Sequence, residues 1–580
     1  MKSLKFLFLA TAIAMVAYAC KKSFLDKPAL GQLDPSALAN KNGVNGLLIG
    51  AYSLLDGYGG AGGGFGTAAS NWVYGSIAGT EAHKGSSVGD QPDIVPIETF
   101  KPTSTNSYFE GKWQMVYDGV SRCNDVIRTA ALATDISAND LNEILAEARG
   151  LRAWYHFEAK KLWNNIPFVD ETVTYGANNY FVSNTTDAYP KIEADLQFAV
   201  ANLPTSQSAP GRLNKYSAEA ILAKVYMFEH KYSDAQPLLN DIIGSGKYSL
   251  QDQFHKNFDI INKNSTESIF AAQSSVNDGA NGNNGNWGDV LNFPYGGSPG
   301  TCCGFFQPSQ YLVNHFKTDA NGLPLLDNFS ATDVTNDQGL LSSQPFTPYA
   351  GTLDPRLDWT VGRRGIPYLD WGINPGNDWI RAQSDGGPYS PLKNVYPNAL
   401  LGKLTDASFW SSGVTANNVN LIRYADVLLW AAEVETEIGS LSKAEDYVNQ
   451  IRTRAANPAG FVHTYTDPSN PQGGFTNTPA ANYKVSPYPA GYFSTQDIAR
   501  KCIRFERMLE LGMEGHRFFD LVRWGIAAQE INAYFPLEIA SLHIGYLTGA
   551  TFTANKNEYY PIPQTEIDKS NGALVQNPGY

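Results

Sequence analysis

Three glutamates lie at a spacing of four residues near the C-terminal end: Glu506, Glu510 and Glu514. This spacing places them on one face of a helix, where two neighbouring carboxylates could act as general acid and base. Like charges on one face need cations beside them, and Arg507 and Arg517 are the nearest candidates. Because arginines lower the pKa of a carboxyl group, such glutamates are poor acids. The pattern favours a structural ion network, which Asp520 and Arg523 extend.

Other catalytic motifs are missing or incomplete. The run Gly296–Gly300 fits G-x-S-x-G, whose chemistry needs the backbone N–H of the residue after the serine. That residue is Pro299, which has no N–H. No H-E-x-x-H or P-loop sequence occurs, so we expect no cofactor and no metal ion. Several histidines have no partner histidine within a helical turn and are interpreted as surface or capping residues: His83, His156, His315 and His516.

Aromatic and planar polar residues gather in stretches rich in Gly, Asn and Pro. Sugars present flat C–H faces ringed by hydroxyl groups, so a sugar site combines aromatic rings with planar polar side chains. The candidate binding residues are Trp72, Tyr74, Trp287, Phe305, Arg364, Tyr368, Trp371 and Trp379. The alternative is that these rings form a small core of the loops themselves. Trp371 and Trp379 are surrounded by small and polar residues, which favours exposure for these two.

Acidic residues outnumber basic ones in this chain of 580 residues. There are 43 Lys and Arg against 56 Asp and Glu, and loss of Lys2 and Lys5 with a signal segment changes the net charge from −13 to −15. Nucleic-acid binding relies on neutralising phosphates, so no nucleic-acid partner is expected. The 53 Gly and 32 Pro indicate long, structured loops.

The first twenty residues indicate secretion. Lys2 and Lys5 precede an uncharged apolar run that is shorter than a membrane-spanning helix and ends at Cys20. Residues 1–19 are therefore predicted to be a signal peptide, and the sequence before Cys20 resembles a lipoprotein processing site. The resemblance implies membrane attachment through a lipid on Cys20. Cys123 and Cys502 lie on apolar helical faces and are expected in the core. Cys302 and Cys303 are expected to be free thiols in a turn, and a disulfide between these two neighbours is the alternative.

Helical periodicity alternates with long irregular stretches. Helices are predicted within 36–56, 108–245, 420–456 and 494–527. After the signal peptide we interpret 20–580 as one domain with an N-terminal helical part (36–272), a loop-rich insertion (273–415) and a C-terminal helical part (416–580). A loop region of this size usually binds something.

The two helical parts share a repeated spacing of alanines. Ala223 precedes Ala235 by twelve residues, and Ala432 precedes Ala444 by the same interval. Each segment is predicted to be a helix, a tight turn and a second helix, and small alanines let the two helices approach closely. Stacked helix pairs of this kind are typical of tetratricopeptide-like repeats.

Several blocks in order resemble one protein family. The first part contains SFLD and GLLIGAYSLL. The C-terminal third contains LIRYADVLLWAAEVETEIGSLSKAEDYVNQIRTRA, IRFERMLELGMEGHRFFDLVRWG and YYPIPQTEID, and the chain ends in QNPGY. Together these blocks resemble the SusD/RagB family of nutrient-binding outer-membrane lipoproteins.

The resemblance implies a mainly α fold of tetratricopeptide-like helix pairs in a right-handed superhelix with a large loop-rich cap. It further implies a lipid-anchored protein on the exterior of the cell outer membrane. Such a protein would bind oligosaccharide and deliver it to a TonB-dependent SusC-like transporter, without being an enzyme. Peptide capture of the RagB kind is the alternative. A surface glycosidase and a purely helical scaffold are further alternatives.

Overall fold

The computed structural model describes residues 35–580 apart from 62–63, 297–298, 300–301, 407–410 and 412. The predicted signal peptide, Cys20 and Ser298 of the G-x-S-x-G run lie outside these described residues. Within the described part, no helix is long and apolar enough to cross a membrane. The same part contains no group of three His, Cys, Asp or Glu side chains that could hold a metal ion.

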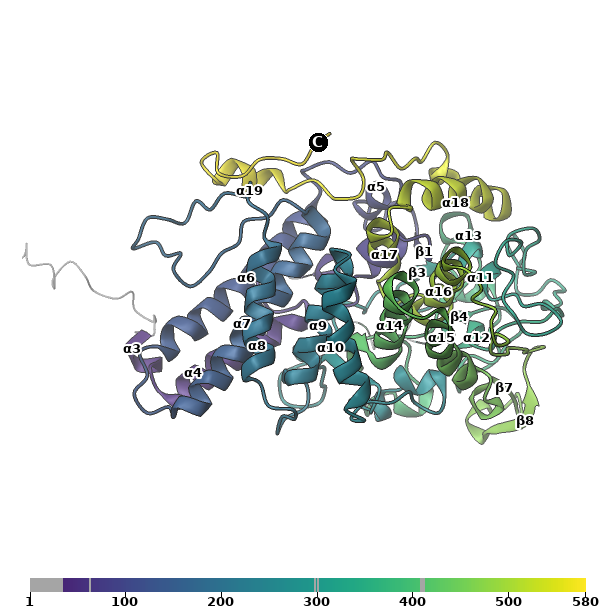
Figure 1. Ribbon diagram of the computed structural model, residues 1–580. Coiled ribbons are helices and arrows are strands. Elements are labelled where there is room, and N and C mark those ends of the chain that lie inside the picture. Colours follow the sequence, from purple (N-terminus) through teal and green to yellow (C-terminus); the bar gives the residue numbers. More distant parts are fainter. Residues whose placement is uncertain (1–34, 62–63, 297–298, 300–301, 407–410, 412) are drawn as a thin grey trace, which may run out of the picture.

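Long helices pack against one another in chain order and form one side of the molecule (Figure 1). Each contacts the next, and α10 contacts α14 although the loop-rich region separates them in the sequence. These helices are α4 (Lys41–Ser53), α6 (Ser107–Ala130), α7 (Ala138–Trp163), α8 (Tyr189–Asn202), α9 (Lys215–Phe228), α10 (Tyr232–Gly244), α14 (Tyr424–Ile438), α15 (Leu441–Ala455) and α16 (Gln496–Leu511).

Local sequence explains where these helices begin. The side chains of Asn106, Ser137, Asn214 and Thr495 accept hydrogen bonds from backbone N–H groups in the first turns of α6, α7, α9 and α16. Such caps satisfy N–H groups that have no partner inside the helix.

The two predicted helix pairs are α9 with α10 and α14 with α15. Ala223, Ala235, Ala432 and Ala444 are all completely buried, as close packing within each pair requires. The pairs also contact each other through α10 and α14. A mainly α fold built from stacked helix pairs is therefore confirmed.

Two segments differ from the sequence prediction. Residues 164–188 form an irregular loop, although they fall within the predicted helical range 108–245, because α7 ends at Asn164 with a φ of +56°. Helix α18 (Ala527–Leu542) lies beyond the predicted end at 527. It contains Pro536, and a proline within a helical pattern normally predicts that the helix ends.

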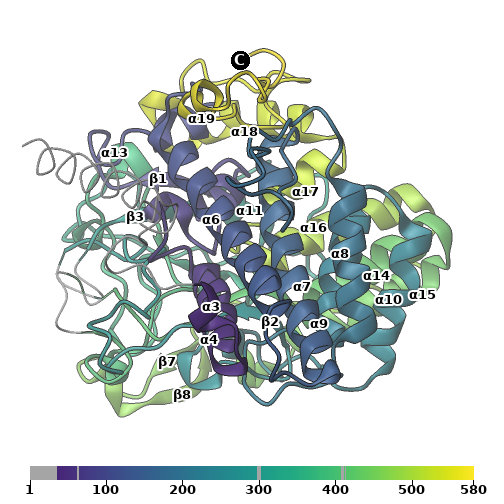
Figure 2. The same cartoon turned by 90° about the vertical axis from the view of Figure 1, so that its left-hand side faces the viewer.

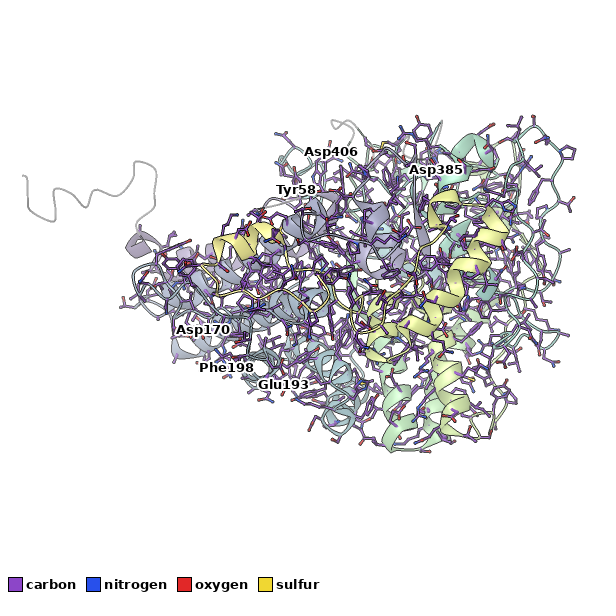
Figure 3. All side chains as sticks on the ribbon, turned by 90° about the horizontal axis from the view of Figure 1, so that it is seen from above. Tyr58, Asp170, Glu193, Phe198, Asp385 and Asp406 are labelled. Atoms are coloured by element: carbon purple, nitrogen blue, oxygen red, sulfur yellow. A yellow bond between two sulfur atoms is a disulfide. The ribbon has the colours of Figure 1, made fainter. Side chains whose placement is uncertain are left out.

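Residues 273–415 form a cap opposite the long helices (Figure 2). Seen from above, Glu193 and Phe198 of α8 lie on one face, while Tyr58, Asp385 and Asp406 lie on the other (Figure 3). Strands β2 (Ser268–Ala272) and β6 (Val419–Arg423) pair antiparallel and hold together the two ends of the cap. The domain boundaries themselves stay a prediction.

The remaining elements are short. The short α-helices are α3 (Pro35–Leu38), α5 (Ile94–Glu98), α11 (Gln310–His315), α12 (Leu357–Thr360), α13 (Gln383–Gly386), α17 (Arg517–Arg523) and α19 (Gln564–Lys569). The short strands form the pairs β1 (Ala82–Gly85) with β3 (Phe305–Pro308), β4 (Val361–Gly362) with β5 (Ser390–Pro391), and β7 (His463–Tyr465) with β8 (Phe475–Pro479). One main apolar core runs through the helices and reaches into the cap. A separate satellite cluster joins cap residues to Ile260 and Ala416 from the adjoining segments, and it consists of Ile260, Phe293, Tyr368, Leu392, Val395, Tyr396 and Ala416.

Glu506 and Glu510 of α16 are buried in an ion network, but their cations come from other segments. The prediction that Glu514 continues the same helix face is wrong, because α16 ends at Leu511. Glu510 contacts Arg356, Arg423 and Arg454 at 3.0, 2.5 and 2.5 Å. Burial disfavours the charged carboxylate, yet these guanidinium groups hold the pKa of Glu510 well below its usual range. The group is therefore a permanent anion and not a proton donor.

The prediction that Arg507 and Arg517 neutralise these glutamates is wrong. Arg507 instead contacts Asp426 and Asp520, each at 2.8 Å, and among the described residues the ion-pair partner of Arg517 is Glu530. On a helix, Arg507 points to a different side from the line of glutamates. The predicted pair Asp520–Arg523 is confirmed at 2.9 Å.

The cysteines follow the sequence prediction in part. Cys123 and Cys502 are buried and free, as expected. Cys302 and Cys303 form a disulfide with each other, so the prediction of two free thiols is wrong.

Candidate ligand-binding groove

Two adjoining hollows form a groove where the cap meets the helical body. They share Phe258, Leu392 and Lys393. The hollow lined by Trp359 encloses about 300 Å³, whereas the hollow lined by the asparagines encloses only about 60 Å³. Ligand clefts commonly enclose roughly 300–1,000 Å³, so the first hollow has the size of a small binding site and the second is a shallow extension of it.

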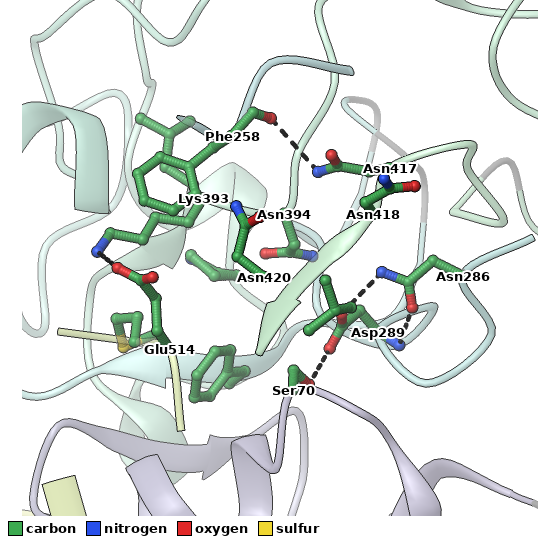
Figure 4. A pocket seen from close by; sticks show the side chains of 15 residues that line it. Ser70, Phe258, Asn286, Asp289, Lys393, Asn394, Asn417, Asn418, Asn420 and Glu514 are labelled. Carbon is green, nitrogen blue, oxygen red and sulfur yellow. Dashed lines mark hydrogen bonds and ion pairs between the residues drawn. The ribbon is translucent and has the colours of Figure 1, made fainter. Parts of the chain in front are cut away.

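One end of the groove is rich in side-chain amides (Figure 4). Its asparagines are Asn286, Asn394, Asn417, Asn418 and Asn420. Neighbouring groups hold them in place. The amide nitrogen of Asn420 donates to the carbonyl of Asn257 at 3.0 Å, and that of Asn286 donates to the Asp289 carboxylate at 2.8 Å. The amides are therefore fixed before any ligand arrives.

Two of these amides keep an acceptor available. Asn394 donates to the carbonyl of Asn292 at 2.6 Å, and Asn417 donates to that of Phe258 at 3.4 Å. Among the described residues, no group donates a hydrogen bond to the side-chain oxygen of Asn394 or Asn417. A hydroxyl group can both donate and accept, so it suits such an amide.

The other end of the groove is aromatic and apolar. The rings of Trp359 and His255 stack with centroids 4.0 Å apart and planes 17° apart. The indole nitrogen of Trp359 donates to the carbonyl of Gly460 at 2.7 Å, which fixes the ring. Burial lowers the pKa of His255 to about 4, so this ring is uncharged at neutral pH. Phe475, which is 47% exposed, adds a further ring.

Between the two ends Lys393 and Glu514 form an ion pair, while the other lining carboxylates, Asp259, Asp289 and Asp370, accept hydrogen bonds from uncharged neighbours. Lys393 contacts Glu514 at 2.7 Å and lies over the ring of Phe258 at 4.7 Å. Burial raises the pKa of Asp289, whose carboxylate accepts hydrogen bonds from Ser70 and Asn286. The groove therefore suits a neutral, hydroxyl-rich ligand with an apolar face.

Four of the predicted binding residues are buried. Trp72, Tyr74, Phe305 and Tyr368 are at most 1% exposed. The ring of Phe305 packs edge-on against that of Trp72, and the hydroxyl groups of Tyr74 and Tyr368 donate to backbone carbonyls. In this conformation they have no surface for a ligand and act as the core that orders the loops.

Trp287 and Arg364 are each 8% exposed and also hold loops together. Trp287 donates to the carbonyl of Gly282 and stacks on Tyr58 at 4.8 Å. Arg364 donates to two loop carbonyls, those of Ser342 and Gln344.

Trp371 and Trp379 are half-buried and pack against the satellite cluster. The indole nitrogen of Trp371 donates to the carbonyl of Tyr396 at 2.7 Å, and Trp379 meets Tyr368 edge-on at 5.4 Å. Neither lines the groove. Whether they contact ligand stays a prediction.

Most residues that line the groove are not among those that the sequence predicts to bind ligand. Asn286 and Phe306 line it and are next in sequence to the predicted Trp287 and Phe305. Trp359 carried no distinguishing signal, because it sits in a short run that resembles any helical turn.

Stacked helix pairs that support a polar and aromatic groove define a helical-repeat protein built to bind a ligand. The chain belongs to the SusD family, whose model matches residues 266–580. A second family model, described as "Starch-binding associating with outer membrane", matches residues 69–227.

Known relatives agree with this assignment. SusD-like protein P2 of Formosa agariphila is 25% identical over 509 residues, covering 83% of each chain. A laminarin-binding SusD-like protein has 22% identity and a TM-score of 0.64, covering 93% of this chain and all of its own. Surface glycan-binding protein A from Bacteroides thetaiotaomicron, solved with laminarihexaose, has 21% identity and a TM-score of 0.63, covering 93% of this chain and 99% of its own. These structures share the tetratricopeptide-like helical fold.

Proposed function

We propose that the protein captures an oligosaccharide in the groove and passes it, uncleaved, to a TonB-dependent SusC-like transporter. The observation that carries the proposal is the Trp359–His255 stack beside a cluster of fixed asparagines. A pyranose ring has an apolar face for the former and hydroxyl groups for the latter. The names of two structural neighbours, which state laminarin or laminarihexaose, support the ligand class.

The proposal includes a position on the exterior of the outer membrane, with a lipid on Cys20. The description of the matching family model supports an outer-membrane association. Metabolic labelling with a radioactive fatty acid would detect the lipid, and a Cys20→Ala variant that still carries label would refute this anchor.

Binding without cleavage is supported by the state of the groove carboxylates. Glycoside hydrolysis needs two carboxyl groups on either side of the scissile bond, one of them able to donate a proton. Asp289 and Glu514 are held as described above, and Asp370 accepts hydrogen bonds from the backbone N–H groups of Asn398 and Ala399. Asp259 accepts hydrogen bonds from the backbone of Ile261 and the amide of Asn262. Release of reducing ends from a bound polysaccharide would contradict this part of the proposal.

Calorimetry with Trp359→Ala tests the site. We expect this variant to bind the glycan selected from an oligosaccharide panel at least about tenfold more weakly, because a buried aromatic contact contributes on the order of 1–3 kcal/mol. Trp379→Ala is the matched control, since Trp379 packs on the same satellite cluster but does not line the groove.

Equal losses in the two variants would show that the binding surface is not this groove. Wild-type protein that binds a peptide pool but no glycan would replace the ligand class with peptide.

A further inference from the structure

Another hollow, separate from the groove, lies between α16, α17 and the loop around Phe329. Including its open mouth, it measures about 800 Å³. We call it the cationic hollow because four cations line it: Arg500, Lys501, Arg504 and Arg517. Its lining carboxylates are Asp497 and Glu530. A local excess of positive charge is unexpected in a chain with a net charge of −13.

Two of the four cations are already neutralised. Arg500 contacts both carboxylate oxygens of Glu437 at 2.7 Å and Asp497 at 2.9 Å. Lys501 forms an ion pair with Asp327. These pairs leave no charge available for a ligand.

Arg504 has no such partner. Among the described residues its guanidinium group forms no ion pair and no hydrogen bond, and it lies over the ring of Trp524 at 5.2 Å. The group is half-buried, and burial together with the charges of Arg500 and Arg523 lowers its pKa. An unpaired guanidinium in partly desolvated surroundings is costly, so an anion there would be stabilising.

Arg517 is also incompletely satisfied. It is 7% exposed, and its contact with Glu530 is long, at 3.5 Å. Its Nε is buried and has no hydrogen-bond partner among the described residues. Two guanidinium groups with unused donors therefore line one hollow.

Three aromatic rings that pack on one another also line the hollow, and of these Phe329 is the partly exposed one. The ring of His315 lies 3.8 Å from that of Phe329 and 4.8 Å from that of Phe505. Burial lowers the pKa of His315 to about 3, so the ring is neutral and apolar in character. Together, guanidinium donors and ring faces match a ligand with a planar anionic group and a flat apolar side.

We propose that the cationic hollow binds the carboxylate of an acidic sugar, a uronic acid, through Arg504 and Arg517. The planar fork of a guanidinium group matches a carboxylate with two parallel hydrogen bonds. The partly exposed ring of Phe329 would contact the sugar ring. The site is separate from the groove and does not rest on the function proposed for it.

Titration of the purified protein with sodium glucuronate, glucose and sulfate, followed by NMR or calorimetry, tests this inference. We expect saturable glucuronate binding that exceeds sulfate binding, with none for glucose. Loss of a charge-assisted hydrogen-bonded pair should weaken glucuronate binding at least about tenfold in Arg504→Gln. Arg128→Gln, which removes a half-buried arginine of α6 that does not line the hollow, should bind as the wild type does.

Because Arg504 leaves no partner unpaired when it is replaced, Arg504→Gln should fold normally, and thermal melting verifies this. Arg504→Lys keeps the charge but loses the planar fork, so it should restore only part of the binding. Unchanged glucuronate binding in Arg504→Gln would overturn the proposal, as would sulfate binding equal to that of glucuronate. Neutral glycan binding in the groove should be the same in all these variants.

Discussion

His83 joins the nearby helix α5 to α18, which is far away in the sequence. Its Nδ1 lies 2.9 Å from Glu98 of α5 and its Nε2 lies 2.8 Å from Glu538 of α18, with the ring fully buried. Burial alone would lower the pKa of His83, but the hydrogen bonds to Glu538 and Glu98 outweigh it and raise the pKa to about 9. The interpretation of His83 as a surface or capping residue is therefore wrong. His156 and His315 are also buried, so the same interpretation is wrong for them.

This arrangement predicts a pH-dependent stability. The pKa of His83 in the unfolded chain is near 6.5, so its stabilisation is complete below that pH and is lost as the pH rises through about 9. The wild type should therefore have a higher unfolding free energy than His83→Gln, and this difference should be larger at pH 6 than above pH 9. The change in the difference should be up to roughly 3 kcal/mol. Urea denaturation at three pH values measures the difference.

His463→Gln is the control, because His463 lies in the hairpin β7–β8 away from this cluster. A difference between wild type and His83→Gln that stays constant from pH 6 to pH 9 would show that the charge on His83 does not matter.

For single residues, the sequence predicts which residue types form the binding site and the ion network, but few of the positions that do so. The indole of Trp72 donates to the carbonyl of Gly288, and Glu510 is neutralised by Arg356, Arg423 and Arg454 from three other segments. Burial and pairing of this kind depend on contacts across the whole chain. Periodicity and local composition cannot encode them.

Helices were easier to predict, because a helix is specified by its own residues. The twelve-residue interval between alanines, for example, corresponds to buried positions in both pairs. The irregular segment 164–188 and helix α18 show the limit. Tertiary contacts decide there, and Pro536 within α18 contradicts the local signal.

Ala432 is the element-level test of the helix pairs. It is completely buried in α14, which packs against α10, α15 and α16. Ala432→Leu should lower the free energy of unfolding by about 1–3 kcal/mol, because a larger side chain has no room there. Chemical denaturation measures the change.

Ala201→Leu on the exposed side of α8 is the matched control and should change stability by less than about 0.5 kcal/mol. Equal effects at the two positions would mean that the pair does not rely on the small side chain.

For the whole molecule, the two apolar cores differ in extent and so should differ in stability. The main core runs through every long helix, whereas the satellite cluster holds much of 366–404. Ion pairs join the cap to the body, since Arg356 of the cap contacts Glu506 and Glu510 of α16. The scaffold is thus expected to be rigid, with the wall of the groove more easily opened.

Hydrogen exchange monitored by mass spectrometry tests this difference. Local opening is easier where fewer apolar contacts are buried, so amides in 366–404 should exchange at least about tenfold faster than those of α14. A glycan bound in the groove would contact the wall formed by Leu392 to Pro397 and should slow exchange there, while α8 on the opposite face should not change. Exchange at one rate throughout cap and body would contradict the division into two cores. Slowing of α8 without slowing of 392–397 would place the ligand on the helical face instead.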